Sequence, residues 1–200
     1  MSSLSNQAQN SLAQQSNQTL WIKNPLAVFS GAISGRDAER DLRGGIVIQG
    51  SQIIECIAAG QQPVTAVDQQ LDASDMVLLP GLINTHHHFY QTLTRCLPAA
   101  INQPLFPWLQ TLYPVWAGLT AKHIEVATEI ACWELMLSGA TTVADHHYVF
   151  NHALSEAIDI QAEVAGRLGV RATLTRGSMS LSQKDGGLPP DSVVQTEQQI

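Results

Sequence analysis

The amino-acid sequence predicts an α/β protein in which a small β segment precedes a sheet of parallel strands. Three observations lead to this prediction. Short β-type runs fill the chain up to about residue 70, an apolar run climbs from Met76 into a group of three histidines, and strand-like and helix-like patterns alternate after it. Alternating strands and helices favour a parallel sheet whose helices form the crossovers.

Composition and charge restrict the kind of partner. With 200 residues, 44% of them hydrophobic and 14% charged, the chain can bury a substantial core. Its net charge of −7 and the lack of a basic stripe argue against nucleic-acid binding. The sequence has no signal peptide or membrane span, and its three cysteines are widely spaced, as in a reduced protein. We expect a cytoplasmic protein that acts on a small neutral or cationic molecule.

The N-terminal part divides into a tail and a β segment. Residues 1–18 are rich in Ser, Gln and Asn and predict a flexible tail without a function. Residues 19–72 contain four short β-type runs, and the last two form a hairpin candidate that turns at Gly50-Ser51. The four runs are 20–22, 26–29, 45–48 and 52–57.

The first parallel strand is predicted over residues 71–85, where a near-continuous apolar run fits a strand covered on both faces. Side chains alternate along a strand, so His86 and His88 project to one side and His87 to the other. Two neutral imidazoles at a strand end can bind zinc. The alternative is an exposed histidine tract without a function, but the position at the end of a buried strand favours a metal site.

A long aromatic-rich connection follows over residues 89–119. Its four prolines rule out one uninterrupted helix. Loops of this kind commonly form substrate pockets, although the rings could equally cap the core.

Two helices and two strands complete the pattern. We predict helices over 120–138, with Thr120 as N-cap, and over 154–168, closed by Gly169. The strands cover 140–144 and 170–174.

Polar residues follow both of these strands. Alternation puts Asp145 and His147 on one face and His146 on the other. We expect His147 and Tyr148 to contact substrate or to orient the first histidine pair, with a structural role as the alternative. Arg176 would hold a carbonyl or carboxylate oxygen, or else form a salt bridge.

Several runs carry a resemblance to a known family. The run L-P-G-L-I-N-T-H-H-H resembles the first-strand motif P-G-x-x-[ND]-x-H-x-H of the amidohydrolase superfamily. The runs H-H-H-F-Y-Q-T-L-T-R, P-L-F-P-W-L, L-Y-P-V-W and A-D-H-H-Y are similar to its nucleobase and triazine deaminases. The resemblance covers about residues 20 to 200.

The resemblance implies a fold. It is the N-terminal portion of a (β/α)8 TIM-type barrel preceded by a small β-sandwich segment, with residues 19–72 in the sandwich and 73–200 forming the first three β/α units. Such a barrel needs about 250 residues, so we expect an incomplete part of a homo-oligomeric enzyme, inactive by itself. The alternative is a non-catalytic metal-binding half-barrel.

The resemblance also implies a reaction. One divalent metal, zinc or alternatively iron(II), would be held by His86 and His88 together with ligands and a proton-shuttling glutamate that this sequence lacks. Gln91 and Trp108 would contact a purine-like substrate. The reaction would be hydrolytic deamination of 8-oxoguanine to urate and ammonia, with guanine, isoxanthopterin or a triazine as rival substrates.

Overall fold

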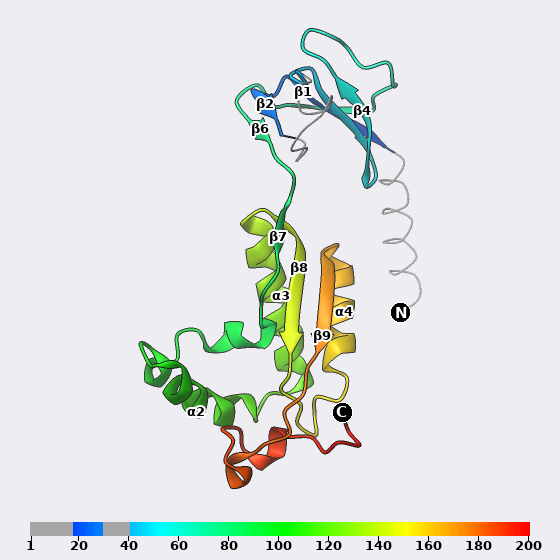
Figure 1. The fold of residues 1–200 in the computed structure, drawn as a ribbon. Helices are drawn as coiled ribbons and strands as arrows, with labels where there is room; N and C mark the ends of the chain where they lie inside the picture. The colour runs from blue at the N-terminus through cyan, green and yellow to red at the C-terminus, as the bar shows by residue number, and fades with distance from the viewer. Residues whose placement is uncertain (1–17, 30–40) are drawn as a thin grey trace. The chain divides into compact units, whose positions relative to one another are not determined.

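A computed structural model describes residues 18–29 and 41–200 of the protein, and the chain divides into two compact units, residues 1–80 and 81–200 (Figure 1). The predicted tail lies outside the described residues except for Gln18. The units divide at Pro80, whereas the predicted domain boundary lies between residues 72 and 73. Among the described residues, no helix combines the length and the apolar character needed to cross a bilayer.

Unit 1 is built from short strands. Its main sheet has the order β4-β3-β1-β5, and a separate parallel pair joins β2 to β6. The predicted hairpin is confirmed, because β3 and β4 pair antiparallel and turn between Gln49 and Gln52. Trp21 is buried in the core of this sheet, and its indole Nε1 donates to Gly44 O at 3.0 Å. The strands are β1 (Thr19–Lys23), β2 (Ala27–Val28), β3 (Gly45–Gln49), β4 (Gln52–Ile57), β5 (Gln69–Asp72) and β6 (Val77–Leu78).

The prediction of one strand over residues 71–85 is wrong. The segment contributes to three short strands with three different partners: β5 pairs with β1, β6 with β2, and β7 (Leu82–Asn84) with β8 (Ala140–His147). A turn closed by Met76 N–H to Ala73 O separates the first two. Pro80, which has no N–H to donate, precedes the third. Leu82 and Ile83 are also exposed rather than covered on both faces.

Unit 2 has the predicted parallel arrangement. Strands β7, β8 (Ala140–His147) and β9 (Arg171–Arg176) form a sheet in that order, and both neighbouring pairs are parallel. Figure 1 shows helices α3 (Ala121–Leu137) and α4 (Ala157–Leu168) on one side of this sheet. Val143 of β8 packs there with Ala131, Cys132 and Leu135 of α3 in a buried cluster. The α/β fold class is confirmed, in the form of a partial barrel whose sheet is not closed among the described residues.

The predicted N-cap of α3 and the predicted C-terminal stop of α4 are also confirmed, whereas α4 begins at Ala157 rather than at residue 154. Thr120 caps α3 through a capping box in which the His123 side chain bonds back to the Thr120 backbone. Gly169 ends α4 with φ at 74°, in the left-handed region that glycine adopts without strain. His123 therefore has a structural role at the start of α3.

The connection between β7 and α3 contains separate short helices, as its prolines predict. They are η1 (Phe89–Thr94), η2 (Pro98–Ala100) and α2 (Leu105–Trp116). Trp116 is fully buried, with its ring centroid 5.2 Å from that of Tyr90 and 5.5 Å from that of Tyr113. These contacts join α2 to η1, directly after the three histidines. Two further short helices, η3 (Gln183–Asp185) and η4 (Asp191–Val193), follow β9.

Asn151 connects two loops of unit 2. Its Nδ2 donates to Ala117 O and Leu119 O, each at 2.8 Å, and its Oδ1 accepts from the Ala153 amide. Replacing Asn151 with alanine is expected to lower the free energy of unfolding by about 1 to 2 kcal/mol, because largely buried carbonyls lose their donor. Urea denaturation measures this, with the exposed Gln103→Ala as control. An unchanged midpoint in the Asn151 variant would contradict the prediction.

Candidate metal and substrate site

Three histidines meet at the carboxyl ends of β7 and β8. The ring centroids of His86 and His88 are 5.0 Å apart, and the His146 ring lies 5.4 Å from His86 and 6.0 Å from His88. The parallel pairing of β7 with β8 brings these residues to the same edge of the sheet. His86 and His88 therefore lie side by side, as the alternation in the sequence predicts.

His88 is held in a state suited to metal binding. Its Nδ1 lies 2.6 Å from His146 O, and because a carbonyl only accepts, Nδ1 carries the proton and donates. The other nitrogen, Nε2, then keeps its lone pair. Partial burial lowers the pKa of His88, an effect that the bond to His146 O opposes and that nearby His86 and His146 reinforce. At neutral pH His88 is thus a neutral imidazole with one free nitrogen.

His147 does not lie with this group. It is fully buried, with its ring 5.2 Å from Tyr90 and 4.9 Å from Phe150, and its Nε2 donates to Val149 O at 2.8 Å. Burial lowers the pKa of His147 to about 4. The predicted substrate contact by His147 is corrected to a packed, neutral histidine in the core.

His146 is the residue that the sequence interpretation missed. Alternation along β8 correctly separates His146 from Asp145 and His147, but the interpretation placed His147, and not His146, at the site. Val143 lies on the same face as Asp145 and His147, and all three are buried. An apolar residue at that position was the signal that this face packs against the helices.

Asp145 joins three elements. Its Oδ1 accepts from the Phe89 amide at 2.6 Å, and its Oδ2 accepts from Gln161 Nε2 of α4 at 2.8 Å. Asp145 is fully buried, and this desolvation raises the pKa of its carboxyl to about 6 against the opposing effect of the two hydrogen bonds.

Gln91 belongs to a cluster of phenols beside His88. Its Nε2 donates to Tyr90 Oη at 3.3 Å and to Tyr148 Oη at 3.4 Å, and the Tyr148 ring stands edge-on to His88 at 5.3 Å. Burial, with Tyr148 nearby, raises the pKa of Tyr90 and raises that of Tyr113 to about 12. These two phenols therefore stay protonated at neutral pH.

A cavity of about 220 Å³ opens beside the histidines. It is lined by His86, His87, His88, Gln91, Thr92 and Arg95. Arg95 forms an ion pair with Glu134 of α3, with its Nη2 2.7 Å from Glu134 Oε1. The predicted pair of histidines and Gln91 thus face one common space.

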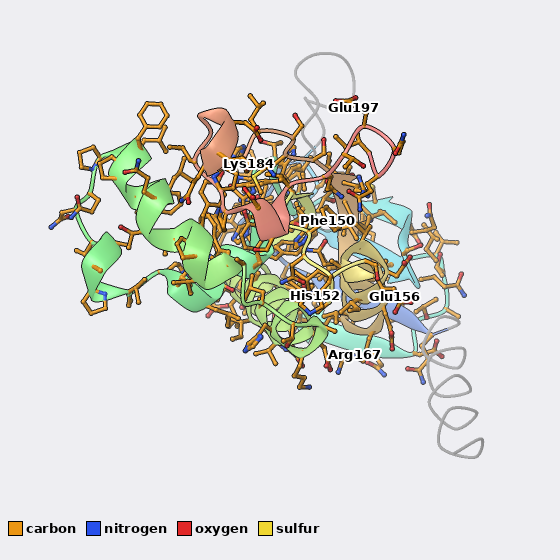
Figure 2. All side chains as sticks on the ribbon, turned by 90° about the horizontal axis from the view of Figure 1, so that it is seen from below. Phe150, His152, Glu156, Arg167, Lys184 and Glu197 are labelled. Atoms are coloured by element: carbon orange, nitrogen blue, oxygen red, sulfur yellow. The ribbon has the colours of Figure 1, made fainter. Side chains whose placement is uncertain are left out.

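Trp108 and Arg176 have other neighbours. The Trp108 ring is half-buried, 5.5 Å from Trp116, within the aromatic cluster of α2. The Arg176 guanidinium lies 4.6 Å above the ring of Phe150, which is labelled in Figure 2, and Nη2 donates to Gln199 O at 3.2 Å. Within the described part of the chain Arg176 has no ion-pair partner, so the salt-bridge alternative finds no support.

The two histidines fit part of a metal site. Neutral imidazoles are ligands that zinc and iron(II) accept, and His88 offers a free Nε2 fixed by a hydrogen bond on the opposite nitrogen. Across residues 18–29 and 41–200, however, no group of three or more His, Cys, Asp or Glu side chains is arranged to hold a metal. A metal at this position would need further ligands besides His86 and His88.

The sequence of the chain is similar to those of known proteins. A sequence model described as "Amidohydrolase family" matches residues 77–200. The chain is 58% identical over 180 residues to an 8-oxoguanine deaminase of Pseudomonas aeruginosa, covering 90% of this chain and 39% of that protein. It is 34% identical over 172 residues to an isoxanthopterin deaminase of an unknown prokaryotic organism, covering 84% of this chain and 35% of that protein.

The fold is also similar to solved structures. An atrazine chlorohydrolase from Arthrobacter aurescens TC1, crystallised with zinc, superposes with a TM-score of 0.74 at 29% identity, covering 90% of this chain and 40% of that one. This chain therefore spans about two fifths of the length of the proteins it matches.

Proposed function

Because the chain belongs to the amidohydrolase family, we propose that it supplies part of the active site of a zinc-dependent hydrolase that deaminates a purine-like ring, with 8-oxoguanine as the substrate. The observation that carries the proposal is the side-by-side pair His86 and His88, in which His88 keeps a free Nε2. The 58% identity to an 8-oxoguanine deaminase supports the choice of substrate. We further propose that the intact enzyme is cytoplasmic and homo-oligomeric.

The chain's own residues have separable tasks in this proposal. A divalent metal bound at His86 and His88 would lower the pKa of a bound water to about 7. The bond from His88 Nδ1 to His146 O keeps that imidazole neutral and fixes its orientation. Gln91 and the Tyr148 hydroxyl offer hydrogen-bonding groups beside it, suited to the N–H and C=O edge of an oxidised purine. Trp108 and Arg176 are proposed as further substrate contacts on the basis of the family resemblance.

A substrate panel tests the proposal. Ammonia release would be measured with the zinc-loaded protein expressed from its complete reading frame, using 8-oxoguanine, guanine, isoxanthopterin and a hydroxylated aminotriazine. The expected result is the highest kcat/KM with 8-oxoguanine. Turnover of guanine without turnover of 8-oxoguanine would contradict the proposed substrate. A lack of ammonia release from all four would contradict the reaction itself.

Replacing Gln91 with leucine is expected to lower kcat/KM for 8-oxoguanine about 10-fold, since one or two neutral hydrogen bonds to the ring are lost. Leucine is close in volume, so zinc content should stay at the wild-type level. Steady-state kinetics and zinc analysis measure both quantities. The matched control is Gln110→Leu on the exposed side of α2. Equal kcat/KM in the two variants would remove Gln91 from the substrate contacts.

A further inference from the structure

Three hydrogen bonds attach the histidine segment to β8. The His146 amide donates to His87 O at 2.9 Å, His88 Nδ1 donates to His146 O at 2.6 Å, and the Phe89 amide donates to Asp145 Oδ1 at 2.6 Å. In the first two, β8 contributes only the backbone amide and carbonyl of residue 146, which would be present with any side chain at that position. The third depends on one side chain, that of Asp145.

Asp145 occupies an unusual place for a carboxylate. It is fully buried on the helix-facing side of β8, among residues such as Val143 and Cys132. Burying an ionised group is unfavourable, and apolar side chains of similar volume commonly give equal or greater stability at such positions. Packing alone therefore does not account for an aspartate here.

The two contacts of Asp145 explain what the carboxylate does. One oxygen holds the amide of the residue directly after His88, and the other is anchored by Gln161 Nε2 of α4 at 2.8 Å. The backbone on the C-terminal side of His88 is thereby fixed to both the sheet and a helix. His88 can then keep the orientation in which Nδ1 reaches His146 O and Nε2 stays free.

We propose that Asp145 is a positioning residue for the metal-binding histidine His88, acting through the Phe89 amide, and that Gln161 holds Asp145 in place. This inference rests on the proposed metal site, but not on the identity of the substrate. It assigns a role in the site to a buried side chain that contacts neither metal nor substrate.

The variant Asp145→Val separates positioning from packing, because valine fills the buried position but cannot accept from the Phe89 amide. We expect this variant to fold, the zinc affinity to fall about 10- to 100-fold, and hydrogen exchange of the Phe89 amide to become faster. Asp145→Asn is the conservative variant: Gln161 Oε1 is buried without a partner, so the Gln161 amide can turn over and accept from the asparagine NH₂ group, leaving the asparagine oxygen for Phe89, and most of the zinc affinity should be retained. Zinc affinity is measured by competition with a chelator on the full-length protein, and exchange by NMR of the zinc-free protein.

Two control variants test whether a loss of zinc affinity is specific to Asp145. Asp159→Val makes the same change on the exposed side of α4 and should leave zinc affinity unchanged. Val143→Ala creates a cavity in the same strand, and should lower stability without a comparable loss of zinc. Should Asp145→Val fail to fold, Gln161→Leu keeps the carboxylate but removes its anchor, and a smaller loss of zinc affinity is expected.

The outcomes are distinguishable from failure of the proposed function. Wild-type zinc affinity and Phe89 exchange in a folded Asp145→Val protein, or in Gln161→Leu where that variant replaces it, would overturn the positioning role. A zinc loss matched by Val143→Ala at equal loss of stability would also overturn it. If the wild-type protein itself bound no zinc, the proposed function would fail, and Phe89 exchange together with the His88 tautomer, read by NMR, would still decide whether Asp145 positions this segment.

Discussion

Replacing either His86 or His88 with alanine is expected to abolish stoichiometric zinc binding and to lower deamination by more than about 100-fold. Residues that merely support a metal ligand account for about 10- to 100-fold in affinity or activity, so loss of a ligand should exceed that range. The two ring centroids lie 5.0 Å apart, and each ring contributes its own nitrogen ligand. One histidine therefore cannot take over the ligand of the other. Metal analysis after dialysis and steady-state ammonia release measure the two effects.

The control for this experiment is His123→Gln. His123 lies at the start of α3, where glutamine can take over its part in the capping box. This variant removes an imidazole from the protein but should retain zinc and activity. Full activity in His86→Ala and His88→Ala would refute the metal site, and with it the proposed reaction.

The pH dependence of stability should change in opposite directions in Asp145→Asn and His147→Gln. Burial raises the pKa of Asp145 from 3.8 to about 6 and lowers that of His147 from 6.5 to about 4. Between about pH 4 and pH 6 the folded protein therefore holds both groups neutral, whereas the unfolded chain holds both charged. The folded and the unfolded state each bind one proton at Asp145 and His147 taken together. These two groups therefore leave the free energy of unfolding almost independent of pH in this range.

Single substitutions expose the two contributions. With Asp145 replaced, only His147 titrates: the unfolded state binds the extra proton, and stability falls as pH drops from 6 to 4 relative to the wild type. With His147 replaced, only Asp145 titrates: the folded state binds the extra proton, and stability falls as pH rises from 4 to 6. Each slope is about 1.4 kcal/mol per pH unit, or roughly 3 kcal/mol across the window.

Urea denaturation of the zinc-free variants at pH 4, 5 and 6, followed by circular dichroism, measures these slopes relative to the wild type. Among the described residues, helices α2, α3 and α4 all lie in unit 2, the unit that contains Asp145 and His147. Parallel pH profiles of the two variants would show that the groups titrate alike in the folded and unfolded chains.

Local signals in the sequence predicted much of unit 2. The capping residues Thr120 and Gly169 mark helix ends through bonds within a few residues, so no tertiary information is needed to find them. The pair His86 and His88 was identified in the same way, because alternation along one segment decides that both point to one side. The prolines from Pro98 onward likewise predicted an interrupted connection.

The partner of each strand could not be predicted in this way. The apolar run around Met76 reads as one strand, but its parts pair with different strands in different units, and composition does not specify a partner. The same reason explains why the sequence pointed to His147 rather than to His146 at the site. Alternation separates the two faces of β8, but which face meets the helices is decided by tertiary packing, and only Val143 hinted at it.

The outer strands of the unit 2 sheet have unpaired edges that can promote self-association during folding. Among the described residues, β7 and β9 each pair on one side only, and β7 presents Leu82 and Ile83 to solvent. Unpaired backbone groups beside apolar side chains invite pairing with another chain. Newly made copies that meet before these edges are covered would join to one another, so correct folding competes with self-association and should be favoured by dilution.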